Sequence, residues 1–185
     1  MLTAIRPLLR LVRYLPDRLL HSSRRRRALA HLAGRKVSSA TFICLGNINR
    51  SAYAAGAFGG LMADRNPPVL IRSAGFIGPD RPASDLALKV AAQRAVDLGG
   101  HRSRRVDAAE LIGTDLIVVM DVRQRNEISR LIDRPGSQIL ILGDLDPDPA
   151  DRRAIQDPYG HPEDVFVRVF DRIDRCLAQL AGVLP

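Results

Sequence analysis

Four short apolar runs alternate with four helical patterns over most of the chain, and this alternation restricts the possible folds most. The apolar runs are rich in β-branched residues, as strands are, and the segments between them repeat apolar residues at helical spacing. The predicted strands and helices, in pairs along the chain, are Ala40–Cys44 and Ala52–Met62, Val69–Ser73 and Ser84–Leu98, Asp115–Met120 and Arg123–Ile132, and Gln138–Leu142 and Pro162–Leu180. Strands that alternate with helices in this way form a parallel sheet covered on both faces. We therefore predict an α/β fold, a three-layer sandwich around a four-stranded parallel sheet.

The first predicted strand ends at Cys44, and Arg50 follows six residues later. In such sheets the carboxyl ends of the strands share one edge, where ligands bind. A short glycine-containing loop between a strand and a helix can turn successive backbone N–H groups inward, and the helix adds about half a positive charge at its N-terminus. Such a loop binds a phosphate group, and it also favours the anionic form of a neighbouring thiol.

This segment predicts an enzyme that attacks a phosphoryl group with sulfur. A thiolate is a strong nucleophile, and an arginine opposite it offers phosphate a planar, permanently charged pair of donors. The alternative is a buried structural cysteine at a strand end, because free cysteines are commonly buried and inert. Arginine is abundant in this chain, so the order of strand, loop and helix supports the prediction more than the Cys-to-Arg spacing does.

A carboxylic acid far downstream, Asp157, precedes Pro158 in a turn-forming stretch. Cleavage of an aryl phosphate ester leaves a phenolate oxygen, and a positioned acid that protonates this oxygen accelerates the step by about 10²–10⁴-fold. Taken alone, an Asp-Pro pair indicates an ordinary turn or helix start. Together with the Cys44 loop, it predicts that Asp157 is the proton donor.

The run Cys44–Ser51, combined with Asp157–Tyr159, resembles the low-molecular-weight protein tyrosine phosphatases, in their bacterial form. Three further stretches agree in order and separation, namely Ser73–Gly75, Gly100–Arg104 and Asp115–Asp121. The resemblance covers about residues 38–183 and implies a flavodoxin-like phosphatase fold. It also implies hydrolysis of phosphotyrosine and small aryl phosphates through a cysteinyl-phosphate intermediate, without a metal or any other cofactor.

The resemblance implies the role of each site residue. Cys44 is the nucleophile, Arg50 clamps the phosphate, and Asp157 is the acid and later the base. The phosphate-binding residues are Leu45, Gly46, Asn47, Ile48, Asn49 and Arg50. Ser51 is implied to donate a hydrogen bond to the thiolate, and the side chain of Asn47 to hold the loop in shape.

The substrate pocket is implied to include Ile48 and Tyr159. Relatives that act on phosphoarginine tend to have threonine where this chain has Ile48, so the resemblance favours phosphotyrosine. Many family members carry a second cysteine directly before the arginine, and this chain has Asn49 there. That departure puts protection of the nucleophile against oxidation in doubt, but not catalysis.

Two other functions stay open at this stage. An arsenate reductase on the same scaffold needs two further cysteines on a segment after the loop, and the chain has only Cys44 and Cys176. We expect Cys176, in the last helical segment, to be a core residue. The second alternative is a phosphotyrosine-binding or scaffold protein anchored through a basic N-terminal segment.

The positive charge of the chain is concentrated at its start. The formal net charge is +8, and residues 1–36 hold ten basic residues and one acidic residue, whereas residues 37–185 hold 18 and 19. We therefore predict two parts, a basic amphipathic extension over residues 1–36 and a phosphatase domain over residues 37–185. Because Pro16 interrupts the helical pattern, the extension is predicted to form one or two short helices with an apolar stripe at Ile5, Leu8, Leu9 and Val12.

Several roles for this extension remain open: a solvated or loosely docked tail, an anchor to an anionic membrane surface or acidic partner, or an organelle transit peptide. Nucleic-acid binding is the least favoured, because no aromatic residues accompany the basic run. No apolar run reaches the length of a membrane span. We expect a cytoplasmic enzyme with peripheral membrane association, whose partner is a phosphotyrosine protein such as a tyrosine autokinase.

Overall fold

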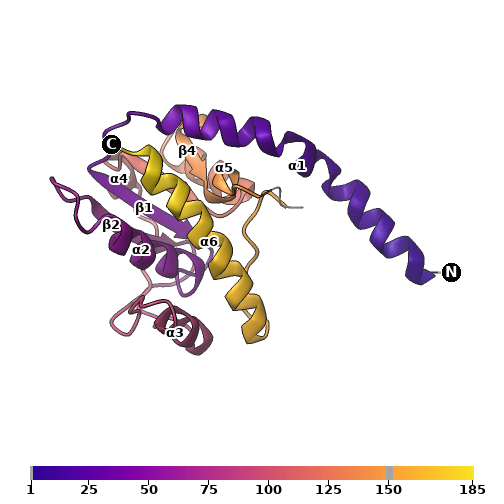
Figure 1. The fold of residues 1–185 in the computed structure, drawn as a ribbon. Helices are drawn as coiled ribbons and strands as arrows, with labels where there is room; N and C mark the ends of the chain where they lie inside the picture. The colour runs from indigo at the N-terminus through magenta and orange to yellow at the C-terminus, as the bar shows by residue number, and fades with distance from the viewer. Residues whose placement is uncertain (1, 149–151) are drawn as a thin grey trace.

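The computed structural model describes residues 2–148 and 152–185, with side chains from residue 15 onward. Its strands are β1 (Ser39–Cys44), β2 (Leu70–Gly75), β3 (Leu116–Val119) and β4 (Ile139–Ile141). Its α-helices are α1 (Leu2–Leu32), α2 (Arg50–Leu61), α3 (Asp85–Ala92), α4 (Ala108–Ile112), α5 (Val122–Leu131) and α6 (Glu163–Val183). Two 3₁₀ turns flank β4, η1 (Gly136–Gln138) and η2 (Leu142–Leu145). The predicted α/β fold is therefore confirmed, with four strands near the expected positions (Figure 1).

The sheet is parallel throughout, in the order β2-β1-β3-β4. Strand β1 lies in the middle, and its last residue, Cys44, pairs with Gly75 at the end of β2. The order reverses between β2 and β3 on either side of β1, and ligands of open parallel sheets bind at such a switch point. The fold thus places Cys44 at the edge where a ligand site is expected.

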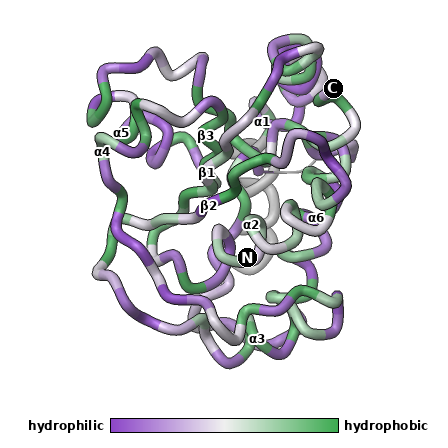
Figure 2. Tube along the Cα trace, turned by 90° about the vertical axis from the view of Figure 1, so that its left-hand side faces the viewer, coloured by the Kyte–Doolittle hydropathy of each residue, from purple (hydrophilic) through white to green (hydrophobic). Residues whose placement is uncertain are grey.

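Alternate residues of the central strands pack into two separate cores. Phe42, Cys44 and Val118 face the larger core, which contains side chains of α2, α3 and α6. Ile43, Ile117 and Val119 face the smaller core, which contains side chains of α4 and α5. Figure 2 shows hydrophobic residues concentrated along β1 and β3 in the middle of the molecule, whereas the outer helices alternate in colour. This alternation is what a strand between two helical layers requires.

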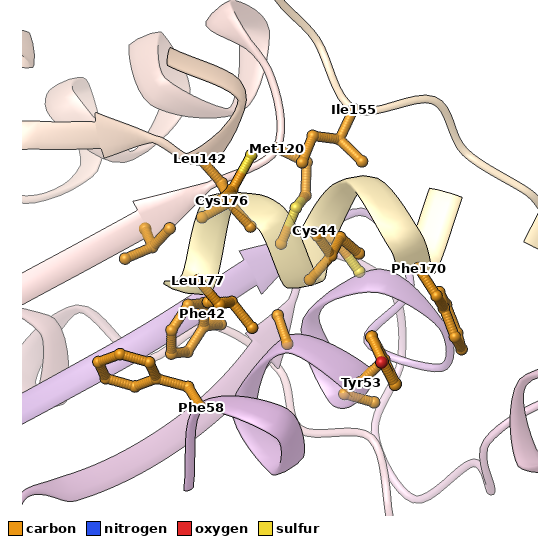
Figure 3. Packing of buried hydrophobic residues seen from close by; sticks show 14 of the residues in the cluster. Phe42, Cys44, Tyr53, Phe58, Met120, Leu142, Ile155, Phe170, Cys176 and Leu177 are labelled. Atoms are coloured by element: carbon orange, nitrogen blue, oxygen red, sulfur yellow. The ribbon is translucent and has the colours of Figure 1, made fainter. Parts of the chain in front are cut away.

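Aromatic side chains fill the space between α2 and α6 (Figure 3). The rings of Tyr53 and Phe170 stack with centroids 3.8 Å apart, and Phe42 meets Phe58 edge to face at 5.4 Å. The hydroxyl of Tyr53 donates to the carboxylate of Asp174, at 2.7 and 2.8 Å to its two oxygens. Burial, followed by the hydrogen bond to Asp174, raises the pKa of Tyr53. This packing fixes α2, the helix that begins at Arg50, against the rest of the domain.

The N-terminal extension is one long helix rather than one or two short ones, since α1 continues through Pro16. Figure 1 shows α1 changing direction partway along its length, as helices do at an internal proline, and its N-terminal end projecting away from the domain. Its C-terminal half is docked, because Leu32 is buried and the ring of buried His21 donates to the carbonyl of Asp146 at 3.0 Å. The predicted stripe at Ile5, Leu8, Leu9 and Val12 lies outside the residues whose side chains are described.

Two other elements differ from the prediction. Helix α3 ends at Ala92, whereas its pattern predicts helix up to Leu98. Ala95 has a positive φ of 57°, a conformation that cannot continue a right-handed helix. The short helix α4 was not predicted, because five residues show too little periodicity to be recognised.

We predict that Phe170→Ala destabilises the domain by about 3–5 kcal/mol, because it opens a cavity beside the Tyr53 ring. Chemical denaturation monitored by circular dichroism measures this loss. The control is Arg168→Ala on the same helix, where an exposed ion pair with Asp164 is worth at most about 0.5 kcal/mol. Equal losses in the two variants would show that the ring stack does not hold α2 in place.

Candidate active site

The carbonyl groups of the loop after Cys44 point outward and accept hydrogen bonds from neighbouring segments. The carbonyl of Leu45 accepts hydrogen bonds from the N–H groups of Phe76 and Ile77, at 2.8 and 3.1 Å. The next three carbonyls, of Gly46, Asn47 and Ile48, accept from the guanidinium of Arg81, the ring of His101 and the N–H of Ser84, at 2.6, 2.6 and 3.2 Å. Because the N–H and C=O of a peptide unit point in opposite directions, four outward carbonyls turn the loop amides inward.

The sulfur of Cys44 lies inside this loop and receives polar contacts there. The N–H of Asn47 donates to Sγ at 3.3 Å, and the hydroxyl of Ser51 lies 3.0 Å from Sγ. The amide Nδ2 of Asn47 donates to Ser51 Oγ at 2.9 Å, so the hydroxyl proton of Ser51 has two acceptors, the nearer Sγ and the carbonyl of Ala74 at 3.4 Å. Cys44 is 3% exposed, so these donors are almost shielded from water, and hydrogen bonds to an anionic acceptor are strong under such conditions.

Asn47 connects the loop to its surroundings and is fully buried. Its φ of 52° is in the left-handed region, which asparagine tolerates better than most residues. Its side-chain oxygen accepts from the N–H of Arg104 at 2.8 Å, while its side-chain nitrogen donates to Ser51. One amide side chain thus ties the loop, the first turn of α2 and the segment before α4 together.

Arg50 and Asp157 meet at the site although 107 positions separate them in the chain. One terminal nitrogen of Arg50 donates to the carboxylate of Asp157, and the other donates to the carbonyl of Ile155 at 3.1 Å. The Nε–H of Arg50 is buried and has no partner among the described residues. A buried donor without a partner is costly, so this guanidinium is suited to an anion that binds in the loop.

A cavity of about 280 Å³ opens above the loop. The predicted residues that line it are Cys44, Leu45, Gly46, Ile48, Asn49, Asp157 and Tyr159, and two residues that were not predicted, Ile77 and Arg81, complete its wall. Tyr159 is 68% exposed and stands at the rim. Asn47, Arg50 and Ser51 are buried behind the lining residues. Every site residue predicted from the sequence is therefore in the cavity wall or in contact with it.

The supporting residues outside the loop were not predicted. Arg81, His101 and Ser84 bind the loop carbonyls, and Ser84 Oγ also donates to Asn49 Oδ1 at 2.6 Å. The chain region of His101 carries part of the family resemblance, but no sequence signal marks Arg81 or Ser84 as neighbours of the loop. The arginines at 102, 104 and 105 do not line the cavity. The described residues contain no cluster of three His, Cys, Asp or Glu side chains that could hold a metal ion.

The fold and the site together define a class of protein. A parallel α/β sandwich carries a thiol at the end of its central strand, inside a loop of inward amides, with an arginine behind it and a carboxylate across the cavity. This combination is typical of phosphatases that use a cysteine nucleophile.

Comparison with known proteins identifies the family. Residues 39–184 match the model of the family described as low molecular weight phosphotyrosine protein phosphatase, so the chain belongs to that family. The family is thus defined by phosphatase action on phosphotyrosine proteins.

Relatives and solved structures agree with this assignment. The low molecular weight protein-tyrosine-phosphatase Etp of Escherichia coli K12 is 28% identical over 151 residues, which are 81% of this chain and 97% of Etp. The probable phosphatase EpsP of Ralstonia nicotianae is 30% identical over 135 residues, 72% of this chain and 86% of EpsP. The crystal structure of the tyrosine phosphatase Wzb of Escherichia coli K30 with sulphate superposes with a TM-score of 0.70 at 27% identity, covering 80% of this chain and 98% of Wzb.

The contact between β2 and the loop generates a prediction. A Cβ on Gly75 would lie 2.8 Å from the backbone nitrogen of Asn47 and 2.9 Å from the carbonyl oxygen of Leu45. Gly75→Ala must therefore displace the loop, and we expect kcat/KM to fall by about 10²-fold, the cost of an ångström-scale misplacement.

The matched control is Gly78→Ala, since a Cβ on Gly78 meets no atom within 4 Å. Steady-state kinetics with an aryl phosphate, together with circular dichroism to check folding, compares the two variants. Wild-type activity in a folded Gly75→Ala protein would mean that the amide loop does not need its present position.

Proposed function

We propose that this chain dephosphorylates phosphotyrosine in proteins, with Cys44 as the nucleophile, Arg50 as the phosphate clamp and Asp157 as the general acid and base. The observation that carries the proposal is the setting of the Cys44 sulfur, which the Asn47 N–H and the Ser51 hydroxyl both contact, with Asp157 in the wall of the same cavity. The roles of individual residues come from this geometry and from family membership.

The first step transfers the phosphoryl group to sulfur. The amides of Leu45 to Arg50 bind the non-bridging phosphate oxygens, and Arg50 binds two of them, which stabilises the charge that develops in the transition state. Cys44 Sγ attacks phosphorus in line with the leaving oxygen, the P–O bond breaks, and Asp157 donates its proton to the phenol oxygen. Tyrosine leaves with a neutral hydroxyl, and a cysteinyl phosphate remains.

The contact between Arg50 and Asp157 fits this step. In the structure the two side chains bind each other, and a phosphate dianion is a better partner for a guanidinium than one carboxylate is. When the substrate binds, its phosphate therefore replaces Asp157 as the partner of Arg50. The carboxyl group of Asp157 is then available at the leaving oxygen. In the second step, Asp157 removes a proton from a water molecule, which attacks phosphorus and releases inorganic phosphate and the thiolate. Ser51 and Asn47 support the sulfur in both steps.

The substrate pocket favours an aromatic ester. Ile48 from the loop and Tyr159 from the segment after Asp157 both line the cavity, and a phosphotyrosine ring stacked on Tyr159 gains about 0.5–1.5 kcal/mol beyond burial. An arsenate reductase would need additional reactive cysteines. Cys176 is fully buried on α6, and burial raises its pKa to about 12, so it stays protonated at neutral pH.

The physiological partner follows from the class of substrate. Etp and Wzb are named tyrosine phosphatases, and we infer that the substrate of this chain is a tyrosine-phosphorylated protein, such as a tyrosine autokinase. A scaffold that only binds phosphotyrosine is less well supported, because such a protein would not need both the nucleophile and the acid.

We further propose that residues 1–36 form a separate functional part of the chain that attaches a cytoplasmic enzyme to an anionic membrane surface or an acidic partner. No described helix is long and apolar enough to cross a bilayer. The helix α1 is basic and its N-terminal end projects from the domain (Figure 1), and basic amphipathic helices bind anionic lipid surfaces. The match to the family begins only at residue 39.

Two substitutions test the chemistry. With para-nitrophenyl phosphate, Cys44→Ser should abolish turnover, because the oxygen nucleophile is not ionised at neutral pH. Asp157→Ala should lower kcat by about 10²–10⁴-fold with a phosphotyrosine peptide, whose leaving group needs the proton, and by less with para-nitrophenyl phosphate, whose leaving group is a stable anion. Equal losses with both substrates would contradict the role of Asp157 as the acid.

Sedimentation with vesicles tests the role of the extension. The full chain should bind vesicles that contain anionic lipid and release them at high salt, because each basic residue near such a surface adds about 1 kcal/mol. A chain that begins at Lys36 should not bind, and circular dichroism checks that it is folded. Equal sedimentation of the two chains would exclude the extension as the anchor.

A further inference from the structure

A second cavity, of about 280 Å³, lies between α1 and the sheet edge formed by β4. Five arginines line it, Arg24, Arg27, Arg35, Arg125 and Arg153, together with Asp144, His31, η1 and apolar side chains of α1, β3 and β4. Arg24, Arg27 and Arg35 come from the N-terminal extension, which precedes the family match, and Arg125 and Arg153 come from the phosphatase domain. The two parts of the chain thus build this cavity jointly.

The positive charge in this cavity exceeds the negative charge around it. Asp144 binds Arg153 through two hydrogen bonds of 2.6 Å, and Asp17 pairs with Arg24 at 2.8 Å. The other three arginines, Arg27, Arg35 and Arg125, form no ion pair with any carboxylate among the described residues. Three positive charges therefore remain uncompensated around one small cavity.

Neighbouring groups hold two of these three side chains, Arg35 and Arg125, whereas Arg27 is exposed at the cavity. The Nη2 of Arg35 donates to the carbonyl of Asp115 at 2.5 Å, and its Nη1 contacts the ring of His31 at 3.3 Å. The guanidinium of Arg125 donates from Nε and Nη2 to Asn126 Oδ1, at 3.3 and 3.1 Å, and lies against η1, since a Cβ on Gly136 would be 3.3 Å from its Nε. Both guanidinium groups are held by contacts that leave their charge unneutralised.

The electrostatics of Arg125 point in the same direction. Burial, and next the positive charge of Arg153, lowers the pKa of Arg125, against a smaller opposite effect of Asp144. Like charges are therefore held close together at a cost, as they are in sites that bind a multiply charged anion.

We propose that this cavity binds a compact polyphosphate anion, of the di- or triphosphate class, and that the anion links α1 to the phosphatase domain. Arginine binds phosphate oxygens through its planar pair of donors, and several phosphoryl groups match three uncompensated charges better than one does. The cavity volume of about 280 Å³ lies just below the range of about 300–1,000 Å³ for small-molecule pockets, which favours a compact ligand. The proposal does not depend on the phosphatase reaction.

The site has a direct connection to the catalytic cavity. The N–H of Arg153 donates to Asp17 on α1 at 3.2 Å, and two residues later the carbonyl of Ile155 binds Arg50. Asp157 follows after two more residues. An anion bound by Arg125 would therefore lie beside Arg153, from which the chain runs to the catalytic acid.

Hydrogen exchange with inorganic triphosphate as the probe tests the proposal, because mass spectrometry of peptides separates this cavity from the catalytic loop. Triphosphate, compared with sodium chloride at equal ionic strength, should slow exchange in residues 24–35 and 125–139 of the full-length protein. In the double variant Arg27→Gln with Arg125→Gln, half-maximal protection should require at least about tenfold more triphosphate, because two charge-assisted contacts are lost.

The matched control is Arg26→Gln with Arg123→Gln, which removes the same charge from the same two helices at exposed positions outside the cavity. It should respond as the wild type does, and both double variants should keep the wild-type rate with para-nitrophenyl phosphate within about twofold, which shows that they are folded.

ATP as a second probe distinguishes sources of the anion: tighter binding than triphosphate identifies a nucleotide, and equal binding identifies the phosphate chain alone. Protection confined to residues 45–50, or equal weakening in both double variants, would overturn the proposal.

Discussion

The orientation of four consecutive peptide units after Cys44 is the constraint on which the site depends. Their carbonyls bind groups outside the loop, from the residues after β2, from Arg81, from Ser84 and from His101, so their amides face into the loop, where that of Asn47 donates to the sulfur. Amides that are already oriented need no reorganisation when a phosphate arrives, and this preorganisation is the main source of electrostatic catalysis. The sheet determines where Cys44 lies, and the packing of α2 against α6 determines where Arg50 lies.

Much of this arrangement is predictable from local sequence. The alternation of strand and helix patterns predicts the parallel sheet, and the glycine-containing loop after an apolar strand predicts the anion site. Both features depend on residues that are close together in the chain. The role of Asp157 as the acid was predicted from the chemistry of ester cleavage and the Cys44 loop, but its contact with Arg50 was not, since 107 positions separate the two residues. The roles of Arg81 and Ser84 were not predictable, because a hydrogen bond to a backbone carbonyl leaves no pattern in the sequence.

The N-terminal helix shows where sequence patterns fail. A proline inside a helical pattern predicts a break, because it lacks the N–H group and crowds the preceding turn, yet α1 continues through Pro16. Its second half is stabilised by tertiary contacts, with Leu32 in the core and His21 bound to Asp146, and such contacts override a local preference. Because the match to the family begins at residue 39, the cavity between α1 and β4 is built in part by residues outside the matched region, and it provides a second anion site connected to Asp157.

The covalent intermediate is the most direct test of the account. Asp157→Ala should slow hydrolysis of the intermediate as well as its formation, because it lacks the base, and an activated aryl phosphate should therefore accumulate phosphorylated enzyme in rapid-quench samples. Mass spectrometry of the peptide that contains Cys44 should then find one phosphoryl group on its sulfur, and none in the Cys44→Ala protein. Continued turnover with no phosphorylated Cys44, or with the phosphoryl group on another residue, would contradict the central claim that this loop prepares a sulfur nucleophile for phosphorus.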